Sequence, residues 1–185
     1  MPFQIKIVIF IIASAGIVYV SRHSLRDFRS HGFYRFFAFE AILALILLNL
    51  NYWFYKSFSL HQIISWILLI VSLFLVIHGF LLLRTVGKPK NERHDPSLTG
   101  IEKTTALITV GAYRYIRHPL YGSLLYGGWG VFFKHPSIAR FGLTLLATLF
   151  LIITAKIEDG ENIYFFGAAY QSYMKKTKMF IPFLF

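Results

Sequence analysis

Three scarcities limit what this chain can be. None of its 185 residues is cysteine, only eight are aspartate or glutamate, and charged residues make up 15% of the total. Without cysteine the chain cannot form disulfides, thiolate metal sites or a catalytic thiol. With 56% hydrophobic residues and so few charges, it also lacks the surface of an ordinary soluble domain. These proportions predict an integral membrane protein.

The charges that are present are mostly basic and give a formal net charge of +11. A nucleic-acid-binding patch needs a solvated face, whereas the lysines and arginines here stand between long apolar runs. We therefore expect membrane lipids as partners and no nucleic acid. The seven histidines are scattered and lack the close spacing of membrane di-iron enzymes, so no metal site is expected.

Long apolar runs predict an all-α integral membrane fold, because about 20 helical residues cross the hydrocarbon core of a bilayer. About five transmembrane helices are expected, over residues 3–20, 36–55, 61–83, 120–133 and 139–155. The first run is interpreted as a retained helix, since arginines follow it instead of a small-residue cleavage site. The fourth run reaches only about 21 Å at 1.5 Å per residue. It is therefore expected either to begin within the loop at residues 117–119 or to sit against other helices at a depth that hides its ends. In either case the loop is drawn toward the membrane.

The basic residues predict an orientation. With the N-terminus outside, fifteen of the nineteen lysines and arginines lie on the inner side, so the positive-inside rule favours N-out and C-in. The connection 84–119 and the residues after 155 then share the cytoplasmic side and can form one site. Residues 156–185 are expected to continue as a polar-faced helix, break at Gly167, and return to the bilayer surface as an amphipathic segment.

Residues 111–121 concentrate turn-forming, aromatic and cationic groups between apolar runs. The glycine at 111 gives the backbone freedom, and Pro119 disfavours helical geometry at His118. Arg117 and His118 bring hydrogen-bond donors to the same place. This stretch is predicted to bind a polar group at the membrane surface.

Two acidic residues, Glu158 and Asp159, are predicted to lie on the same side of the membrane as residues 111–121. Cationic donors, aromatic rings and carboxylates together suit a zwitterionic ligand. S-adenosylmethionine is such a ligand, and its sulfonium is attracted to aromatic faces. The alternative is that the basic loop residues anchor anionic lipid headgroups.

Several motifs follow one another along the second half of the chain. Residues 109–121 read Thr-Val-Gly-Ala-Tyr-Arg-Tyr-Ile-Arg-His-Pro-Leu-Tyr, and the acidic pair is followed by Phe-Gly-Ala-Ala-Tyr-Gln-Ser-Tyr at 166–173 and Phe-Ile-Pro at 180–182. Over residues 104–182 the pattern resembles the membrane methyltransferases typified by isoprenylcysteine carboxyl methyltransferase, and phosphatidylethanolamine N-methyltransferases share much of it. The resemblance implies S-adenosylmethionine-dependent methyl transfer, on the cytoplasmic side, to a membrane-resident acceptor that is lipid-soluble or lipid-linked.

The resemblance also implies site residues. Cofactor contacts are expected from the segment before the glycine, the tyrosine after it, the His-Pro-x-Tyr turn and the first acidic residue: Thr105, Ala106, Leu107, Ile108, Tyr113, His118, Pro119, Leu120, Tyr121 and Glu158. Glu158 would hold the cofactor ammonium, and Arg117 and Glu158 are expected nearest the chemistry as catalytic residues. In a single membrane domain, residues 84–185 would then be the cofactor-binding half and residues 1–83 the N-terminal helices.

The chain departs from the family pattern in the second half of the site. Thr154 stands where the prenylcysteine enzymes have an arginine associated with the substrate carboxylate, Asp159 replaces a second glutamate, and Asn162 replaces a usual leucine. The departure at Thr154 leaves the acceptor unassigned.

Two other function classes stay open. A membrane reductase using NADPH would need phosphate-binding groups, for which the candidates are Arg84, Lys88, Lys90 and Arg93. A non-catalytic module would bind anionic lipid through its basic loops.

Polar residues within the apolar runs are functional candidates by default. They are Glu40, Asn49, Asn51 and His78. A structural role is expected for Glu40, through pairing with Arg29 or Arg35, and for His78, through helix packing.

Overall fold

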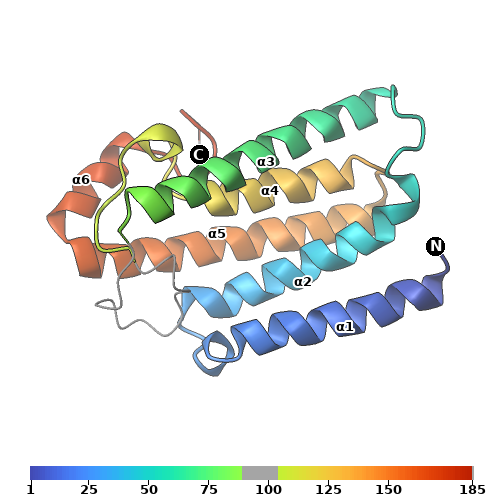
Figure 1. Cartoon of the computed structure of the whole chain (residues 1–185), viewed down its shortest axis with the longest axis horizontal. Helices are drawn as coiled ribbons and strands as arrows, with labels where there is room; N and C mark the ends of the chain where they lie inside the picture. The colour runs from blue at the N-terminus through green and yellow to red at the C-terminus, as the bar shows by residue number, and fades with distance from the viewer. Residues whose placement is uncertain (89–103, 185) are drawn as a thin grey trace.

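The chain folds into a bundle of helices, as the computed structural model of residues 1–88 and 104–184 shows (Figure 1). Five helices run side by side, and a sixth follows at one end of the bundle. They are α1 (Phe3–Ser21), α2 (His31–Asn49), α3 (Leu60–Thr85), α4 (Pro119–Phe132), α5 (Ile138–Phe166) and α6 (Ala168–Lys176). The described residues contain no strand, only an isolated bridge between Ile116 and Lys178. The predicted all-α fold is confirmed.

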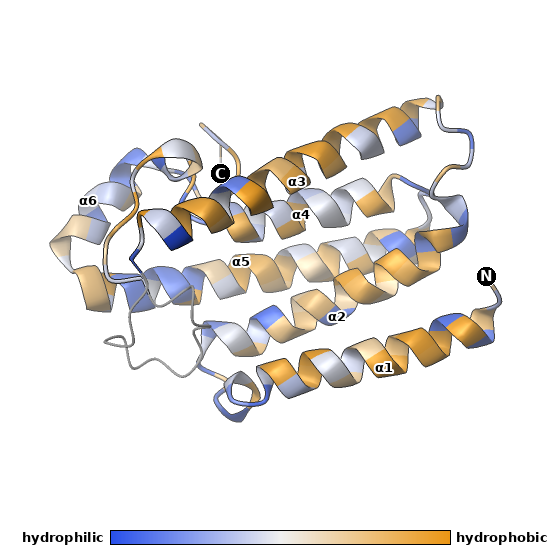
Figure 2. Cartoon of the chain, viewed as in Figure 1, coloured by the Kyte–Doolittle hydropathy of each residue, from blue (hydrophilic) through white to orange (hydrophobic). Residues whose placement is uncertain are grey.

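Four of the helices are long and apolar enough to cross a membrane: α1, α2 with its extension to Tyr52, α3 and α5. The fourth predicted span is α4, whose 14 residues are too few to cross alone. Figure 2 shows hydrophobic residues along the lengths of α1, α2 and α3, and hydrophilic residues gathered around α6 and the connections. The end of the bundle where α5 and α6 meet is therefore polar.

Helix ends follow local chemistry more closely than the apolar runs do. The helix α2 begins at His31, five residues before the predicted span, because the Ser30 hydroxyl caps it by accepting a hydrogen bond from the Phe33 amide (3.3 Å). The helix α5 continues beyond the predicted span to Phe166. It ends at Gly167, whose φ of 60° is readily reached by glycine, as the sequence predicted.

The core is built from the helix pairs α3–α4 and α2–α5 and from the end of the chain. The pair α3–α4 is joined by two serine hydroxyls that donate to backbone carbonyls, Ser65 to Gly130 and Ser72 to Ser123, each at 2.7 Å. Phe180, wholly buried, packs in a cluster with residues of α2, α4 and α5. The chain end therefore enters the core at Phe180, while Phe183 and Leu184 stay exposed.

The polar residues within the bundle have structural partners. Glu40 accepts a hydrogen bond from Ser14 of α1 (2.9 Å), and not, among the described contacts, from Arg29 or Arg35 as expected. The Asn49 amide donates to the Leu45 carbonyl (2.9 Å). His78 stacks on Phe74, as expected for a packing residue. Asn51 lies just past α2 and accepts from the N-terminal amine (2.7 Å).

Candidate functional site

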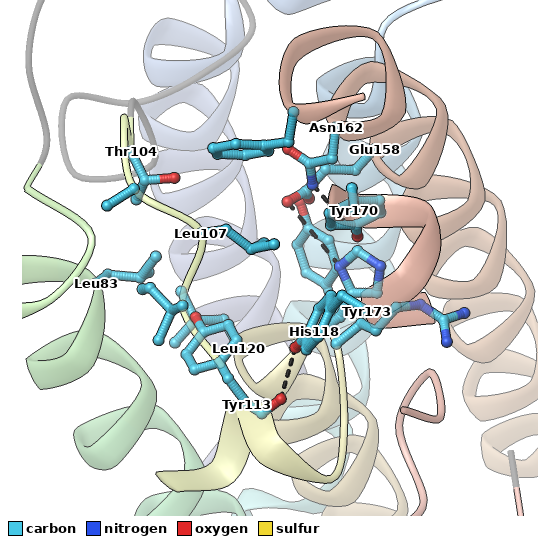
Figure 3. A pocket seen from close by; sticks show the side chains of 15 residues that line it. Leu83, Thr104, Leu107, Tyr113, His118, Leu120, Glu158, Asn162, Tyr170 and Tyr173 are labelled. Carbon is cyan, nitrogen blue, oxygen red and sulfur yellow. Dashed lines mark hydrogen bonds and ion pairs between the residues drawn. The ribbon is translucent and has the colours of Figure 1, made fainter. Parts of the chain in front are cut away.

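A pocket lies at the polar end of the bundle, between α3, the loop that precedes α4, α5 and α6 (Figure 3). It holds about 630 Å³ of empty space, including the part open to solvent. Its lining residues are Leu83, Thr104, Ala106, Leu107, Ile108, Tyr113, Arg117, His118, Leu120, Tyr121, Glu158, Asn162, Phe166, Tyr170 and Tyr173. Figure 3 shows leucines on one side and Glu158, Asn162 and Tyr170 on the other. One wall is thus apolar and the opposite wall polar.

The loop before α4, residues 111–118, forms the floor of the pocket, and its conformation depends on a glycine. Gly111 has a φ of 59° and begins the short helix Gly111–Arg114. A Cβ at this position would lie 2.4 Å from Nε2 of His78 on α3, so only glycine permits both the conformation and the close approach. The loop is also fixed from α6, since the Tyr173 hydroxyl donates to the Tyr113 carbonyl (2.6 Å).

His118 stands outside helical geometry, with φ −122° and ψ 66°, because Pro119 follows it as the first residue of α4. Its carbonyl accepts the Gly122 amide at 2.8 Å and so starts the helix. Its ring is buried, stacks on Tyr121 and faces two carboxylates of α5. The sequence predicted this displaced geometry.

Asp159 gathers three donors. The Arg117 guanidinium donates from Nε and Nη2 over 3.1–3.3 Å, Nε2 of His118 lies 2.9 Å from Oδ1, and the Tyr170 hydroxyl donates at 2.6 Å. Burial and the charge of Asp159 raise the pKa of Tyr170, so this phenol keeps its proton at physiological pH. Burial likewise raises the pKa of Tyr173. The polar wall of the pocket is therefore a fixed hydrogen-bond network.

Glu158 lies outside this network. Its carboxylate lines the pocket with 21% of the side chain exposed. The nearest nitrogen of a basic side chain among its described contacts is Nδ1 of His118, at 4.0 Å, beyond hydrogen-bond distance. Glu158 is therefore the carboxylate that remains available to a cation in the pocket.

Most residues implied by the resemblance come together here. Those that line the pocket are Ala106, Leu107, Ile108, Tyr113, Arg117, His118, Leu120, Tyr121 and Glu158. Thr105 instead donates its hydroxyl to the Lys88 carbonyl (2.9 Å), and Pro119 is buried at the start of α4 without lining the pocket. A cofactor role for each of these residues stays a prediction.

Several lining residues were missed. They are Leu83, Thr104, Asn162, Phe166, Tyr170 and Tyr173. Asn162 follows Glu158 by one helical turn, so helical spacing could have placed it on the same face. Tyr170 and Tyr173 belong to the matched motif but had no assigned role. No signal in the sequence indicated Leu83, which belongs to the predicted N-terminal helices.

The remaining candidates that the structure describes do not line the pocket. Arg84 and Lys88 are exposed and do not line it, while Lys90 and Arg93 lie outside the described residues. Thr154 is wholly buried and donates its hydroxyl to the Phe150 carbonyl (2.7 Å). The Thr154 hydroxyl thus makes a hydrogen bond within its own helix.

Similarity to known proteins covers the same part of the chain. The family described as phospholipid methyltransferase matches residues 60–167. A methanethiol S-methyltransferase from Crocosphaera subtropica is 30% identical over 134 residues, which are 71% of this chain and 47% of that protein. One from Pseudomonas deceptionensis is 25% identical over 119 residues, 64% of this chain and 42% of that protein. The chain thus spans less than half the length of these relatives, and no solved structure matches it significantly.

Proposed function

Because the chain belongs to the phospholipid methyltransferase family, we propose that it transfers a methyl group from S-adenosylmethionine to a lipophilic acceptor at the cytoplasmic surface of a membrane. The observation that carries this proposal is the pocket with one available carboxylate, Glu158, beside aromatic rings and opposite an apolar wall. Few ligands other than a zwitterion with an apolar ring system use all three features.

The residues present fit the cofactor. Glu158 would hold its ammonium group, since a charge-assisted hydrogen bond to a carboxylate is among the strong ones. The aromatic residues Tyr113, Tyr121 and Phe166 line the same pocket, and aromatic rings attract a cation such as the sulfonium. The leucines of the apolar wall would cover the adenine ring.

When bound, S-adenosylmethionine supplies a methyl group on a sulfonium that an acceptor attacks in line. The chain then needs no covalent nucleophile, and its contribution is position, which can reduce the barrier by several kcal/mol. The ring of His118 and the carboxylate of Glu158 stand ready to take a proton from an acceptor that arrives protonated.

The charges favour an acceptor without a carboxylate. Among the described lining residues the only permanent cation is Arg117, and its guanidinium is engaged by Asp159 and the Thr177 carbonyl (2.8 Å). Thr154 adds none. A lipophilic thiol is the first acceptor to test, because the similar proteins are named methanethiol S-methyltransferases.

Calorimetric titration of the detergent-solubilised chain with S-adenosylhomocysteine tests the cofactor assignment. Wild type is expected to bind, and Glu158→Gln to weaken binding by about tenfold or more, as expected for loss of a charged partner. Glu161→Gln, the same change on the same helix outside the pocket lining, should leave the affinity within about threefold. A wild-type chain that does not bind would overturn the proposal.

Product analysis tests the acceptor. Membranes containing the chain are incubated with methyl-labelled cofactor and a lipophilic thiol. Methylation of the thiol gives a thioether, so we expect a labelled product that is stable to base. A base-labile label would indicate a methyl ester and contradict the inference from charge. Binding of NADPH in place of S-adenosylhomocysteine would favour the reductase alternative.

A further inference from the structure

The strongest polar cluster of the pocket is centred on a residue that does not line it. Asp159 is buried, with 8% of its side chain exposed, and is absent from the lining. The three side chains that it holds, Arg117, His118 and Tyr170, all line the pocket. Asp159 therefore contacts a bound ligand only indirectly, through these three residues.

These contacts join three separate parts of the chain. Asp159 belongs to α5, Arg117 and His118 to the loop before α4, and Tyr170 to α6. The loop is also paired with the segment after α6, since the Arg117 amide donates to the Lys178 carbonyl (2.7 Å) and the His118 amide to the Met179 carbonyl (3.2 Å). Asp159 is thus the point where the floor and the polar wall of the pocket meet.

The charge of Asp159 matters as much as its hydrogen bonds. The Arg117 guanidinium is a permanent cation and lines the same pocket as Glu158. Beside Asp159 it is neutralised and held by three donor contacts of 3.1–3.3 Å. If the Asp159 charge were removed, the guanidinium would keep, among its described partners, only the neutral Thr177 carbonyl, and its uncompensated charge would compete for the Glu158 carboxylate.

We propose that Asp159 is a positioning residue of this site, which holds Arg117 and His118 in place and keeps Arg117 from neutralising Glu158. This inference rests on the proposed function and deepens it, because it explains how a pocket with an arginine in its lining can present a negative group to the ammonium of a ligand.

Asp159→Asn separates the charge from the hydrogen bonds, because the amide oxygen still accepts from His118 and Tyr170. Titration with S-adenosylhomocysteine is expected to show an affinity reduced by about tenfold or more, since an unpaired buried cation is costly and seeks a partner. Asp159→Glu keeps the charge and should retain an affinity within about threefold of wild type. A folded Asp159→Asn variant with wild-type affinity would overturn the proposal.

A second substitution tests the role of Arg117. In Arg117→Gln/Asp159→Asn both charges of the pair are removed, which proteins often tolerate. We expect this double variant to bind S-adenosylhomocysteine more tightly than Asp159→Asn, because no guanidinium competes for Glu158. It also replaces Asp159→Asn if the single variant does not fold. A double variant that binds no better than the single one, or that is folded but does not bind, would contradict the proposal.

Glu161→Gln is the matched control, because Glu161 also pairs with a buried histidine of another element, His31, at 2.6 Å. Loss of the Glu161 carboxylate should lower the thermal stability of the chain but not its affinity for S-adenosylhomocysteine. If wild type fails to bind, the proposed function fails; if wild type binds and the Asp159 series shows no charge dependence, only the positioning role fails.

Discussion

Lys134 is the largest wholly buried side chain of the described structure. It lies in the turn between α4 and α5, at the end of the bundle remote from α6. Its ammonium lies 3.3 Å from the centre of the Trp66 ring and 3.1 Å from Oε1 of Gln62, and Gln62 donates back to the Lys134 carbonyl (3.0 Å). The lysine therefore joins this turn to α3 through its charge and its backbone.

Burial lowers the pKa of Lys134 from 10.5 to about 8, which predicts a pH dependence of stability. Above the folded-state pKa the folded chain loses a proton that the unfolded chain still binds, so stability rises from about pH 8 to about pH 10.5, by at most about 3 kcal/mol. Thermal unfolding of wild type and Lys134→Met across this range should show the rise in wild type alone.

Lys156→Met is the control for the lysine titration, because Lys156 is exposed. Its pH profile should follow that of wild type. Parallel profiles for wild type and Lys134→Met would show that the buried amine does not titrate in this range.

The acidic pair shows the limit of sequence reasoning at single residues. The resemblance assigned a role to Glu158, and the structure leaves that carboxylate in the pocket. Asp159 was placed on the same side of the membrane as residues 111–121 but was given no individual role, although it binds Arg117, His118 and Tyr170. A sequence shows that neighbouring residues of a helix point in different directions, but not which partners stand there.

At the scale of elements, apolar runs predicted which of the long helices exist, and serine caps fix where α2 and α5 begin. The run that predicted α2 could not include the polar start at Ser30 and His31, because hydropathy does not register a hydrogen bond to an amide. Which helices pair with one another was even harder to predict from the sequence than where each helix ends. A serine within an apolar run, such as Ser65, indicates contact only once the partner carbonyl of Gly130 is known.

The contact between α3 and α4 predicts the effect of a single methyl group. A Cβ at Gly130 would lie 2.9 Å from Cγ and 3.3 Å from the backbone nitrogen of Leu69, so Gly130→Ala should force the helices apart. We expect a loss of about 1–3 kcal/mol, as for overpacked cores, measured by thermal unfolding in detergent.

Gly142→Ala on α5 is the control, since a Cβ there meets nothing within 4 Å. It should leave the stability unchanged or raise it slightly. Equal stability of the two variants would show that α3 moves away from α4 at little cost.

At the scale of the whole molecule, positive charge is distributed unevenly along the length of the bundle. The end that carries the pocket also carries the connection between α1 and α2 with the start of α2, the end of α3, the loop before α4, the last part of α5, and α6. Twelve of the nineteen lysines and arginines belong to these parts, within residues 22–35, 84–88, 114–117 and 156–178. The opposite end has few basic residues, and one of them, Lys134, is buried. The positive-inside rule then predicts that the pocket opens to the cytoplasm, the side on which the proposed water-soluble cofactor would be supplied.

The absence of cysteine makes this orientation testable, because a single introduced thiol is the only one in the chain. Phe58 lies in the connection between α2 and α3 and is 94% exposed, and Ser172 is exposed on α6 at the other end. A membrane-impermeant maleimide should label Phe58→Cys on intact cells, but Ser172→Cys only after permeabilisation. Both variants should react in detergent and the wild-type chain should not, which controls for access and specificity. The reverse pattern would place the pocket outside and exclude a cytosolic supply of cofactor.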